Sequence, residues 1–267
     1  MMVQGPLRRN QAGLQRALER LASGFRINSA ADDAAGVSLS ARLQSRSRSY
    51  VVAERNTSTA ISMAATADSG ASEISDSLIR LRELSVQAKD GTLTSSDRSA
   101  LDVEFQGLLV EVDRLAAATT FNGSNLLAGV ATSIAFQVGI DGTSNDVISV
   151  EFGGVSVSNL GLSGTSVTGS GVANATAAMT AVDAAFVSLG TTRAKLGSGL
   201  NRLGFALAND QGIRTQLDAA VGATRDADVV EEATNVARYQ VLIAAGASVL
   251  ATANGLAASF VTKLLGL

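Results

Sequence analysis

The 267-residue chain contains no cysteine, no histidine and no tryptophan, and its single proline is Pro6. Histidine and cysteine supply most zinc and iron–sulfur ligands, and histidine is the side chain that titrates near neutral pH. Their absence argues against these metal sites and against histidine-based acid–base catalysis, so we expect no metal and no cofactor. Without cysteine the chain cannot form disulfide bonds.

Nucleic acid and membrane are also poor candidates for partners. The net charge is −3 and aromatic residues make up 4% of the chain, so the arginines of "QSRSRSY" (44–50) are interpreted as solvent-facing. No apolar run typical of a signal peptide occurs in the first 20 residues. Residues 239–262 carry no charge and are long enough to cross a bilayer, but alanine dominates them and polar residues interrupt them. We therefore predict a helix buried in an assembly and no membrane span.

Both ends of the chain show hydrophobic residues at coiled-coil spacing. Neither stripe has a core of its own, and the second is too broad for a two-stranded seam. Their mutual packing is expected to leave apolar surface that only copies of the same chain can cover. The first stripe comprises Leu7, Leu14 and Leu21 with Leu18 and Phe25, and the second comprises Val229, Val236, Ile243, Leu250 and Leu264.

Between the two ends, the hydrophobic period changes twice. Three- and four-residue steps of mostly small residues predict one helix over 34–90, and a shorter helix follows the break at 89–98. An Asn-Gly turn within 119–127 precedes alternation with a period of two, which predicts a β-hairpin over about 134–152. Residues 153–172 are rich in Gly, Ser and Thr and predict a surface loop, with one short strand as an open alternative. Heptads then return, interrupted by Arg193, Asp210 and Arg214.

The predicted fold is mainly α-helical, a long antiparallel coiled-coil-like hairpin or bundle with a small β-hairpin region. Residues 1–32 and 226–267 are expected to form a discontinuous terminal-helix domain. Residues 33–225 are expected to form a helical rod domain that carries the β-hairpin and the loop. Self-assembly follows from this pattern more firmly than any chemistry does.

Adjacent carboxylates raise the alternative of an enzyme. The pairs are Asp32 with Asp33 and Glu231 with Glu232. Neighbouring residues on a helix point about 100° apart, so neither pair converges on one substrate atom. A glycosidase needs two carboxyl groups that face each other across a cleft, and the sequence predicts no cleft. We therefore predict no catalytic residues.

The stretch "SGFRINSAADDAAG" (23–36) is better explained as a joint between two helices. Gly24 and Asn28 tolerate the backbone conformations that end a helix, and Asn28 or Ser29 can cap the helix that follows. The two carboxylates, Asp32 and Asp33, would then lie in its first turn and offset the helix dipole. Arg26 is predicted to form an ion pair, within the chain or between subunits.

Several blocks of the sequence resemble bacterial flagellin in both order and spacing. The resemblance covers about three quarters of the chain and is absent only in the Gly/Ser-rich loop. The blocks are "ALERLASGFRINSAADDAAGVSLSARL" (17–43), "RNTSTAISMAATADSGASEISDSLIRLRELSVQA" (55–88), "TTFNGSNLL" (119–127), "FQVGIDG" (136–142), "LGSGLNRL" (196–203) and "DADVVEEATNVARYQVLIAAGASVLATANGL" (226–256).

The resemblance implies a structural subunit of the extracellular flagellar filament, which serves motility. Flagellins are exported unfolded by the flagellar type III route, and their terminal helices form an inner tube. The implied partners are other copies of the chain, an export chaperone, and the cap and hook-associated proteins. A hook–filament junction protein shares the helical ends, and a flagellin-derived surface adhesin or receptor is a further alternative. The RINSAADDAAG and FNG blocks favour flagellin itself.

Two departures from the family pattern affect these expectations. About 50 residues separate the FNG turn from the C-terminal heptads, so the large outer domains of longer flagellins are expected to be absent. Family members also usually carry about ten more residues before the point where this sequence starts. Either the true start lies upstream or this end was trimmed.

The resemblance also implies a site for an animal Toll-like receptor that binds some flagellins. The matching positions are Arg80, Leu84 and Gln87, together with Glu104 on the next helix. The spacing 80/84/87 is expected to place three of them on one helical face. The alternative is that this face packs against neighbouring subunits, and the sequence leaves both open.

Overall fold

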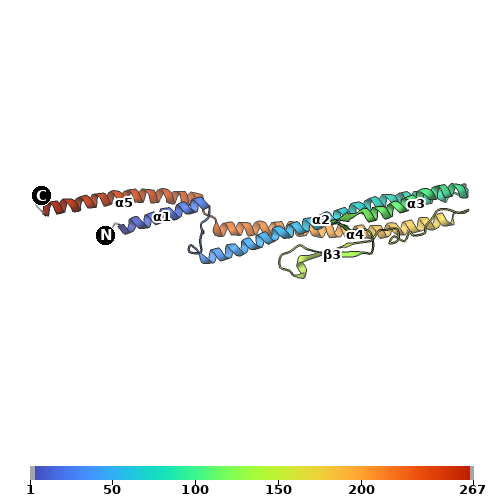
Figure 1. Ribbon diagram of the computed structural model, residues 1–267, viewed down its shortest axis with the longest axis horizontal. Helices are drawn as coiled ribbons and strands as arrows, with labels where there is room; N and C mark the ends of the chain where they lie inside the picture. Colours follow the sequence, from blue (N-terminus) through green and yellow to red (C-terminus); the bar gives the residue numbers. More distant parts are fainter. Residues whose placement is uncertain (1–3, 265–267) are drawn as a thin grey trace. The chain divides into compact units, whose positions relative to one another are not determined.

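The structure is a computed structural model that describes residues 4–264, and the side chains of residues 5–256. Within that part the chain forms long α-helices and two small antiparallel hairpins (Figure 1). The helices are α1 (Gln4–Ser23), α2 (Ala34–Ala88), α3 (Ser95–Ala118), α4 (Ala173–Arg225) and α5 (Val229–Leu264). Strand β1 (Thr120–Phe121) pairs with β2 (Ser124–Asn125), and β3 (Thr132–Gln137) pairs with β4 (Val147–Phe152), which follows the short 3₁₀-helix η1 (Ser144–Asp146).

These elements confirm the predicted mainly α-helical fold. Helix α2 runs for 55 residues without a break, as its seam of small residues predicts. The β-hairpin also forms as predicted, with Ile134 opposite Val150. Asn122 and Gly123 connect β1 to β2 with φ angles of 49° and 77°. Such angles are those of the two-residue turns that join antiparallel strands.

The chain divides into two compact units. Unit 1 comprises residues 1–47 and 215–267, and unit 2 comprises residues 48–214. The predicted domain limits, 32/33 and 225/226, coincide with the ends of the helix breaks, whereas the compact units divide inside α2 and inside α4. The assignment of 1–32 and 226–267 to a functional inner domain stays a prediction.

In unit 2, helices α2, α3 and α4 pack side by side around one hydrophobic core (Figure 1). Ala60, Ala64 and Ala67 of α2 are fully buried, and such short side chains let the backbones approach closely. Larger residues fill the core nearer the end of α2, where Leu78 is fully buried. Phe105 of α3 is also fully buried and completes the core there.

The Gly/Ser-rich segment 153–172 is not the simple surface loop that its composition predicts. Val155, Leu162 and Val167 are fully buried in the core of unit 2, and no strand occurs among these residues. The carboxylate of Asp102 on α3 accepts a hydrogen bond of 2.8 Å from the Val167 amide. The aliphatic residues of this segment therefore pack into the core, and α3 provides a hydrogen-bond acceptor for part of its backbone.

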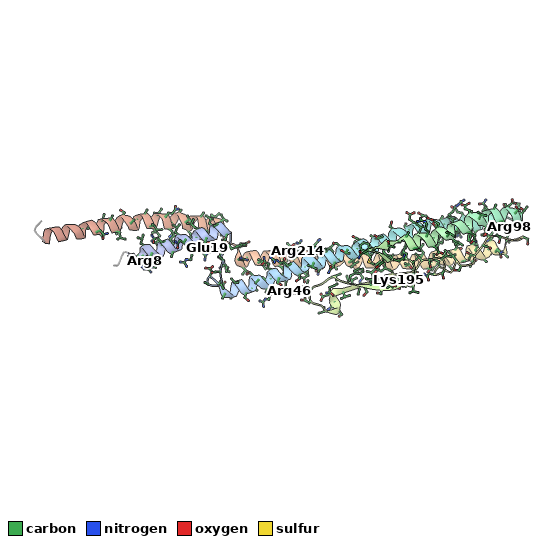
Figure 2. All side chains as sticks on the ribbon, in the orientation of Figure 1. Arg8, Glu19, Arg46, Arg98, Lys195 and Arg214 are labelled. Carbon is green, nitrogen blue, oxygen red and sulfur yellow. The ribbon has the colours of Figure 1, made fainter. Side chains whose placement is uncertain are left out.

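Arg98 secures the end of α2 and is a contact that sequence reasoning missed. Its side chain is 2% exposed, and its position on α3 is labelled in Figure 2. Nε donates to the Ala88 carbonyl at 2.8 Å and Nη2 donates to the Asp90 carbonyl at 2.9 Å. The last carbonyls of a helix lack partners within the helix, so this buried cation supplies what the end of α2 needs.

The β-hairpin is held against α4. Val150 of β4 lies over Gly199, where an added Cβ would stand 3.0 Å from the valine methyl groups. At the surface, Lys195 Nζ and Glu151 Oε1 form an ion pair of 2.7 Å (Figure 2). Both side chains are nearly half exposed, so the pair contributes little energy, and the buried contact at the glycine positions the strand.

Asp210 on α4 is a buried carboxylate that lacks a full set of partners. It is 5% exposed, and its Oδ2 has no hydrogen-bond partner in the described part of the chain. The charged groups near it are Glu54 of α2, Asp146 of η1 and Arg214, one turn further along α4. Arg214 Nε lies 2.8 Å from Glu54 Oε1, so its charge is engaged there. Burial, with repulsion from Glu54 and Asp146, raises the pKa of Asp210 to about 6.

Replacing this carboxylate should stabilise the fold. Asp210→Asn is expected to raise the free energy of unfolding at pH 7 by about 1–3 kcal/mol, because it removes a buried charge that is incompletely paired. The folded pKa of Asp210 lies above the ordinary value of 3.8, so the penalty is fully present above pH 6 and fades as the pH falls toward 4. Urea unfolding of both proteins at pH 7 and pH 4.5 measures the difference.

The advantage of Asp210→Asn should therefore shrink at the lower pH. Glu73→Gln, at an exposed position on α2, is the matched control and should change stability little at either pH. An advantage that stayed constant with pH would contradict the assigned ionisation.

Candidate functional site

The predicted assembly residues lie on α1 and α5, which pair within unit 1 (Figure 1). As residue numbers rise along α1, the numbers of their partners fall along α5, so the two helices run antiparallel. Three contacts define this register: Leu7 with Gly246, Gly13 with Tyr239, and Arg20 with Glu232.

The ion pair in this set is partly buried. Arg20 Nη1 lies 2.9 Å from Glu232 Oε1, and the glutamate side chain is only 8% exposed. Asn235 donates a second, longer hydrogen bond of 3.4 Å to Oε2 of the same carboxylate. Removing one partner of a buried pair leaves an uncompensated charge, so the pair penalises any other alignment of α1 with α5.

The two helix breaks of unit 1 are bound to each other. The Arg225 guanidinium lies 4.1 Å from the centre of the Phe25 ring, a cation–π contact. The Arg26 amide donates to the Arg225 carbonyl at 2.7 Å, and the Ala227 amide donates to the Gly24 carbonyl at 2.9 Å. The joint predicted for 23–36 is therefore half of a larger joint, whose other half is the break between α4 and α5.

The ion pair predicted for Arg26 does not form within the described chain, and an ion pair between subunits stays a prediction. Arg26 Nη2 donates to the Thr224 carbonyl at 2.7 Å, so the group it contacts is a backbone oxygen instead of a carboxylate. Thr224 lies in the last turn of α4, where carbonyl groups lack helical partners and carry the negative end of the helix dipole. A nearby guanidinium satisfies both needs.

The predicted caps of this joint are partly confirmed and partly wrong. Gly24 ends α1 with a φ of +74°, as expected for a left-handed helix-terminating residue. Helix α2, however, begins only at Ala34, and Asp33 caps it by accepting a 2.9 Å hydrogen bond from the Gly36 amide. Neither carboxylate lies in the first turn, and neither Asn28 nor Ser29 caps the helix.

Asp32 instead closes the turn that precedes α2. Its Oδ2 accepts hydrogen bonds from the Ser29 amide at 2.9 Å and from the Asn28 amide at 3.2 Å. The hydrogen bond from the Ser29 backbone is the main cause that lowers the pKa of Asp32. Local side-chain-to-backbone bonding of this kind competes with helix formation and delays the start of α2.

The α1 stripe divides between two faces. Leu7, Leu14 and Phe25 are half-buried, whereas Leu18 and Leu21 are 45% and 36% exposed. The most buried side chain on α1 is that of Ala17, at 3% exposure. The small residue Ala17 therefore faces α5, whereas Leu18 and Leu21 point away from it.

Helix α5 divides in the same way. Val236, Ile243 and Leu250 are half-buried, and Val229 is 58% exposed. The side chain of Leu264 lies outside the described residues. A second stripe at steps of seven faces away from α1, and we call it the outer stripe: Leu242, Val249 and Leu256, which are 39%, 54% and 67% exposed.

Exposed apolar residues at regular spacing mark a surface that binds something. The segment Val229–Leu256 is long and apolar enough to cross a membrane by length and composition alone. The heptad spacing of the outer stripe is more specific, because a lipid-facing helix has no reason to repeat every seven residues. The spacing favours another helix as the partner.

The four predicted receptor residues are not all accessible. Arg80 Nη2 lies 2.7 Å from Glu104 Oε1, and both side chains are 47% exposed. Gln87 is also exposed and lines a groove of about 590 Å³ together with Ile79 and Val86. Leu84 is fully buried, so the expectation that 80, 84 and 87 share one readable face is wrong for this residue. Its position is turned about 40° toward the core relative to Arg80.

Three of the four paired carboxylates are engaged in structural contacts. Asp32 and Asp33 hold the turn and the helix start, and Glu232 holds Arg20. Among the described residues no group of three or more potential metal ligands occurs. What this site offers chemically is a patterned apolar surface with a fixed register.

The chain matches two regions of one protein family. Residues 1–132 match the bacterial flagellin N-terminal helical region, and residues 179–265 match the bacterial flagellin C-terminal helical region. Helices α1 and α5 both fall within the matched regions.

Individual proteins give the same result. A flagellin of Listeria innocua is 36% identical over 262 residues, which cover 93% of this chain and 91% of that protein. The flagellar filament 33 kDa core protein of Treponema phagedenis is 31% identical over 270 residues, which cover 95% and 93%. The crystal structure of Bacillus cereus flagellin superposes with a TM-score of 0.51 at 31% identity, covering 58% of this chain and 88% of that one.

The helix start at Asp33 can be tested directly. Asp33→Ala should weaken the first turn of α2 by about 0.5–2 kcal/mol, because it removes the hydrogen bond to the Gly36 amide. Amide hydrogen exchange at Gly36 should speed up accordingly. Asp33→Asn keeps an acceptor at the same position and should exchange nearly as the unchanged protein does. Equal exchange rates in the Ala and Asn variants would show that Asp33 is not the cap.

Proposed function

Because this chain belongs to the bacterial flagellin family, we propose that its copies assemble by burying the exposed apolar faces of α1 and α5 against one another. The chain is a structural subunit of the extracellular flagellar filament. The observation that carries the proposal is the exposure of Leu242 and Val249 on α5, which are 39% and 54% exposed and seven residues apart, the spacing of a helix–helix seam.

The energetics support assembly through many modest contacts. Each buried Val or Leu contributes roughly 1.5–3 kcal/mol, whereas ordering a residue costs about 1–2 kcal/mol of backbone entropy. Two terminal helices in one chain bury only one face each, so little net stability remains. Burying Leu18, Leu21 and the outer stripe against further copies would supply the additional free energy of apolar burial.

The joint is proposed to transmit the order of the terminal helices to the rest of the chain. Its two halves are linked by backbone hydrogen bonds and by the Phe25–Arg225 contact. Under this proposal, residues 1–32 and 226–267 form the inner tube and residues 33–225 form the surrounding layer. The helix breaks let one chain contribute to both.

Export and the other assembly partners follow from the same family membership. We propose that the chain passes unfolded through the flagellar type III route, is held by an export chaperone, and meets the cap and hook-associated proteins at the filament ends. A chain with no cysteine and one proline has no disulfide to reduce and little that hinders threading. The terminal stripes are the surface a chaperone would cover.

The alternatives have less support. A hook–filament junction protein or a surface adhesin would share the helical ends, but the relatives cited above are flagellins and a filament core protein. An enzyme is not favoured, since the family is structural and three of the four paired carboxylates are engaged in a turn, a helix cap and an ion pair.

We further propose that an animal Toll-like receptor reads the exposed surface formed by Arg80, Gln87 and Glu104 on released monomer. The ion pair between Arg80 and Glu104 is half exposed and links α2 to α3, and Gln87 lies one turn beyond Leu84. The competing explanation is that the same surface packs against neighbouring subunits in the filament. Buried Leu84 would act only by supporting this surface.

A cell-based receptor assay separates the two explanations. Monomer should activate the receptor, and Arg80→Ala and Glu104→Ala should each weaken activation about tenfold or more, as charged residues at the centre of an interface do. Arg114→Ala removes an exposed arginine elsewhere on α3 and should have little effect. Equal activation by all variants would assign this surface to filament packing alone.

The assembly proposal predicts strong effects on the outer stripe. Val249→Asp should raise the critical concentration for seeded polymerisation more than tenfold, since it removes an apolar contact and buries a carboxylate. Ile243→Asp and Leu250→Asp, on the half-buried side of α5, should also block growth while unit 2 stays folded. Sedimentation and electron microscopy across a concentration series measure growth.

Val249→Ile keeps the surface apolar and serves as the control, which should polymerise close to the unchanged protein. Growth of Val249→Asp at the ordinary critical concentration would show that the outer stripe is not an assembly surface.

A further inference from the structure

Tyr239 of α5 lies directly over Gly13 of α1. A Cβ added at Gly13 would stand 2.6 Å from Cζ and 2.7 Å from Cε1 of the tyrosine ring. Real Cβ atoms do not approach other atoms so closely, so a side chain at position 13 would require the tyrosine ring to move from its place over α1. Gly13 itself is buried, and Tyr239 is half-buried.

The glycine is otherwise unfavourable where it stands. Gly13 lies in the middle of α1, where glycine costs about 1 kcal/mol relative to alanine. Gly5, near the start of the same helix, has nothing within 4 Å of an added Cβ. Only Gly13 has a packing reason, and the reason is the tyrosine ring.

The apolar stripes alone leave the register of α1 against α5 weakly determined. Because each stripe repeats every seven residues, sliding one helix by a heptad would place leucines and valines opposite similar residues again. The Gly13–Tyr239 contact occurs once. A slide would move the ring onto a residue with a side chain, and it would also separate Arg20 from Glu232.

We propose that Gly13 and Tyr239 are the specificity-determining pair of the terminal helices, setting the register in which α1 and α5 of this chain pair. A slide by one heptad keeps the same face of α5 outward but shifts that face by about 10 Å along α1, so the pair also sets the position at which neighbouring copies meet it. The inference rests on the proposed assembly function and adds to it the residues that select the alignment.

A double-mutant cycle on the full chain tests the contact. Gly13→Ala should raise the critical concentration for seeded polymerisation by roughly tenfold or more, because the methyl group and the ring overlap. Gly13→Ala/Tyr239→Ala should recover much of this loss, because the smaller side chain makes room. Tyr239→Ala alone should weaken assembly by leaving the space over Gly13 empty.

Two control variants isolate the ring contact. Gly5→Ala makes the same chemical change on the same helix in open space, and Tyr239→Phe keeps the ring. Gly5→Ala should polymerise within about twofold of the unchanged protein because its methyl group meets open space, and Tyr239→Phe should assemble better than Tyr239→Ala because the ring stays over Gly13. The proposal would be overturned if Gly13→Ala polymerised as well as Gly5→Ala. It would also be overturned if the double variant polymerised no better than Gly13→Ala.

The register itself can be read by crosslinking, because the chain has no native cysteine. Leu7→Cys and Gly246→Cys, placed at a second contact of the same register, should be joined in high yield by a short thiol-reactive linker. Adding Gly13→Ala should lower that yield, and an unchanged yield would contradict the proposal.

The crosslink also separates this inference from the assembly proposal. A high yield in soluble chain that does not polymerise would refute the assembly proposal and keep the register. If Val249→Asp failed to polymerise while Gly13→Ala polymerised at the ordinary critical concentration, the register proposal would be refuted and the assembly proposal kept.

Discussion

The structure depends on one constraint: each terminal helix has apolar residues on more than one side, but the described part of the chain packs only one helix against it. Helix α5 places Val236 and Ile243 on its half-buried side and leaves Leu242 and Val249 on the other. Burial that would complete a core inside one chain is therefore available only between chains. Under the proposed assembly, contacts between copies supply the burial that these helices lack within one chain.

The chain combines these terminal helices with a second unit that has a core of its own. Helices α2, α3 and α4 close their own core in unit 2, with fully buried residues such as Leu78 and Phe105. Both helix breaks lie within unit 1, and backbone hydrogen bonds tie them to each other. Restraining one break therefore also restrains the other.

Periodicity predicted the helices and the β-hairpin because it is a local property of the sequence. It does not place the cap of α2, since the choice among Asn28, Ser29 and Asp33 depends on a turn closed by Asp32. It misjudges Leu84 because a rotation of about 40° separates an exposed position from a buried one. The sequence marks Asp210 as an interruption of the heptads, but the burial of Asp210 and Arg98 depends on segments distant in sequence.

In the pair of helices α1 and α5, different residues supply the affinity and the alignment. A heptad stripe repeats, so it supplies burial in several registers almost equally and cannot choose among them. Contacts that occur once can choose, because every shifted register loses them. Gly13 with Tyr239 and Arg20 with Glu232 are two such contacts between α1 and α5, and Phe25 with Arg225 joins the two helix breaks next to them. Under the proposed assembly, the stripes provide the free energy of association and the contacts between α1 and α5 select the alignment in which it is gained.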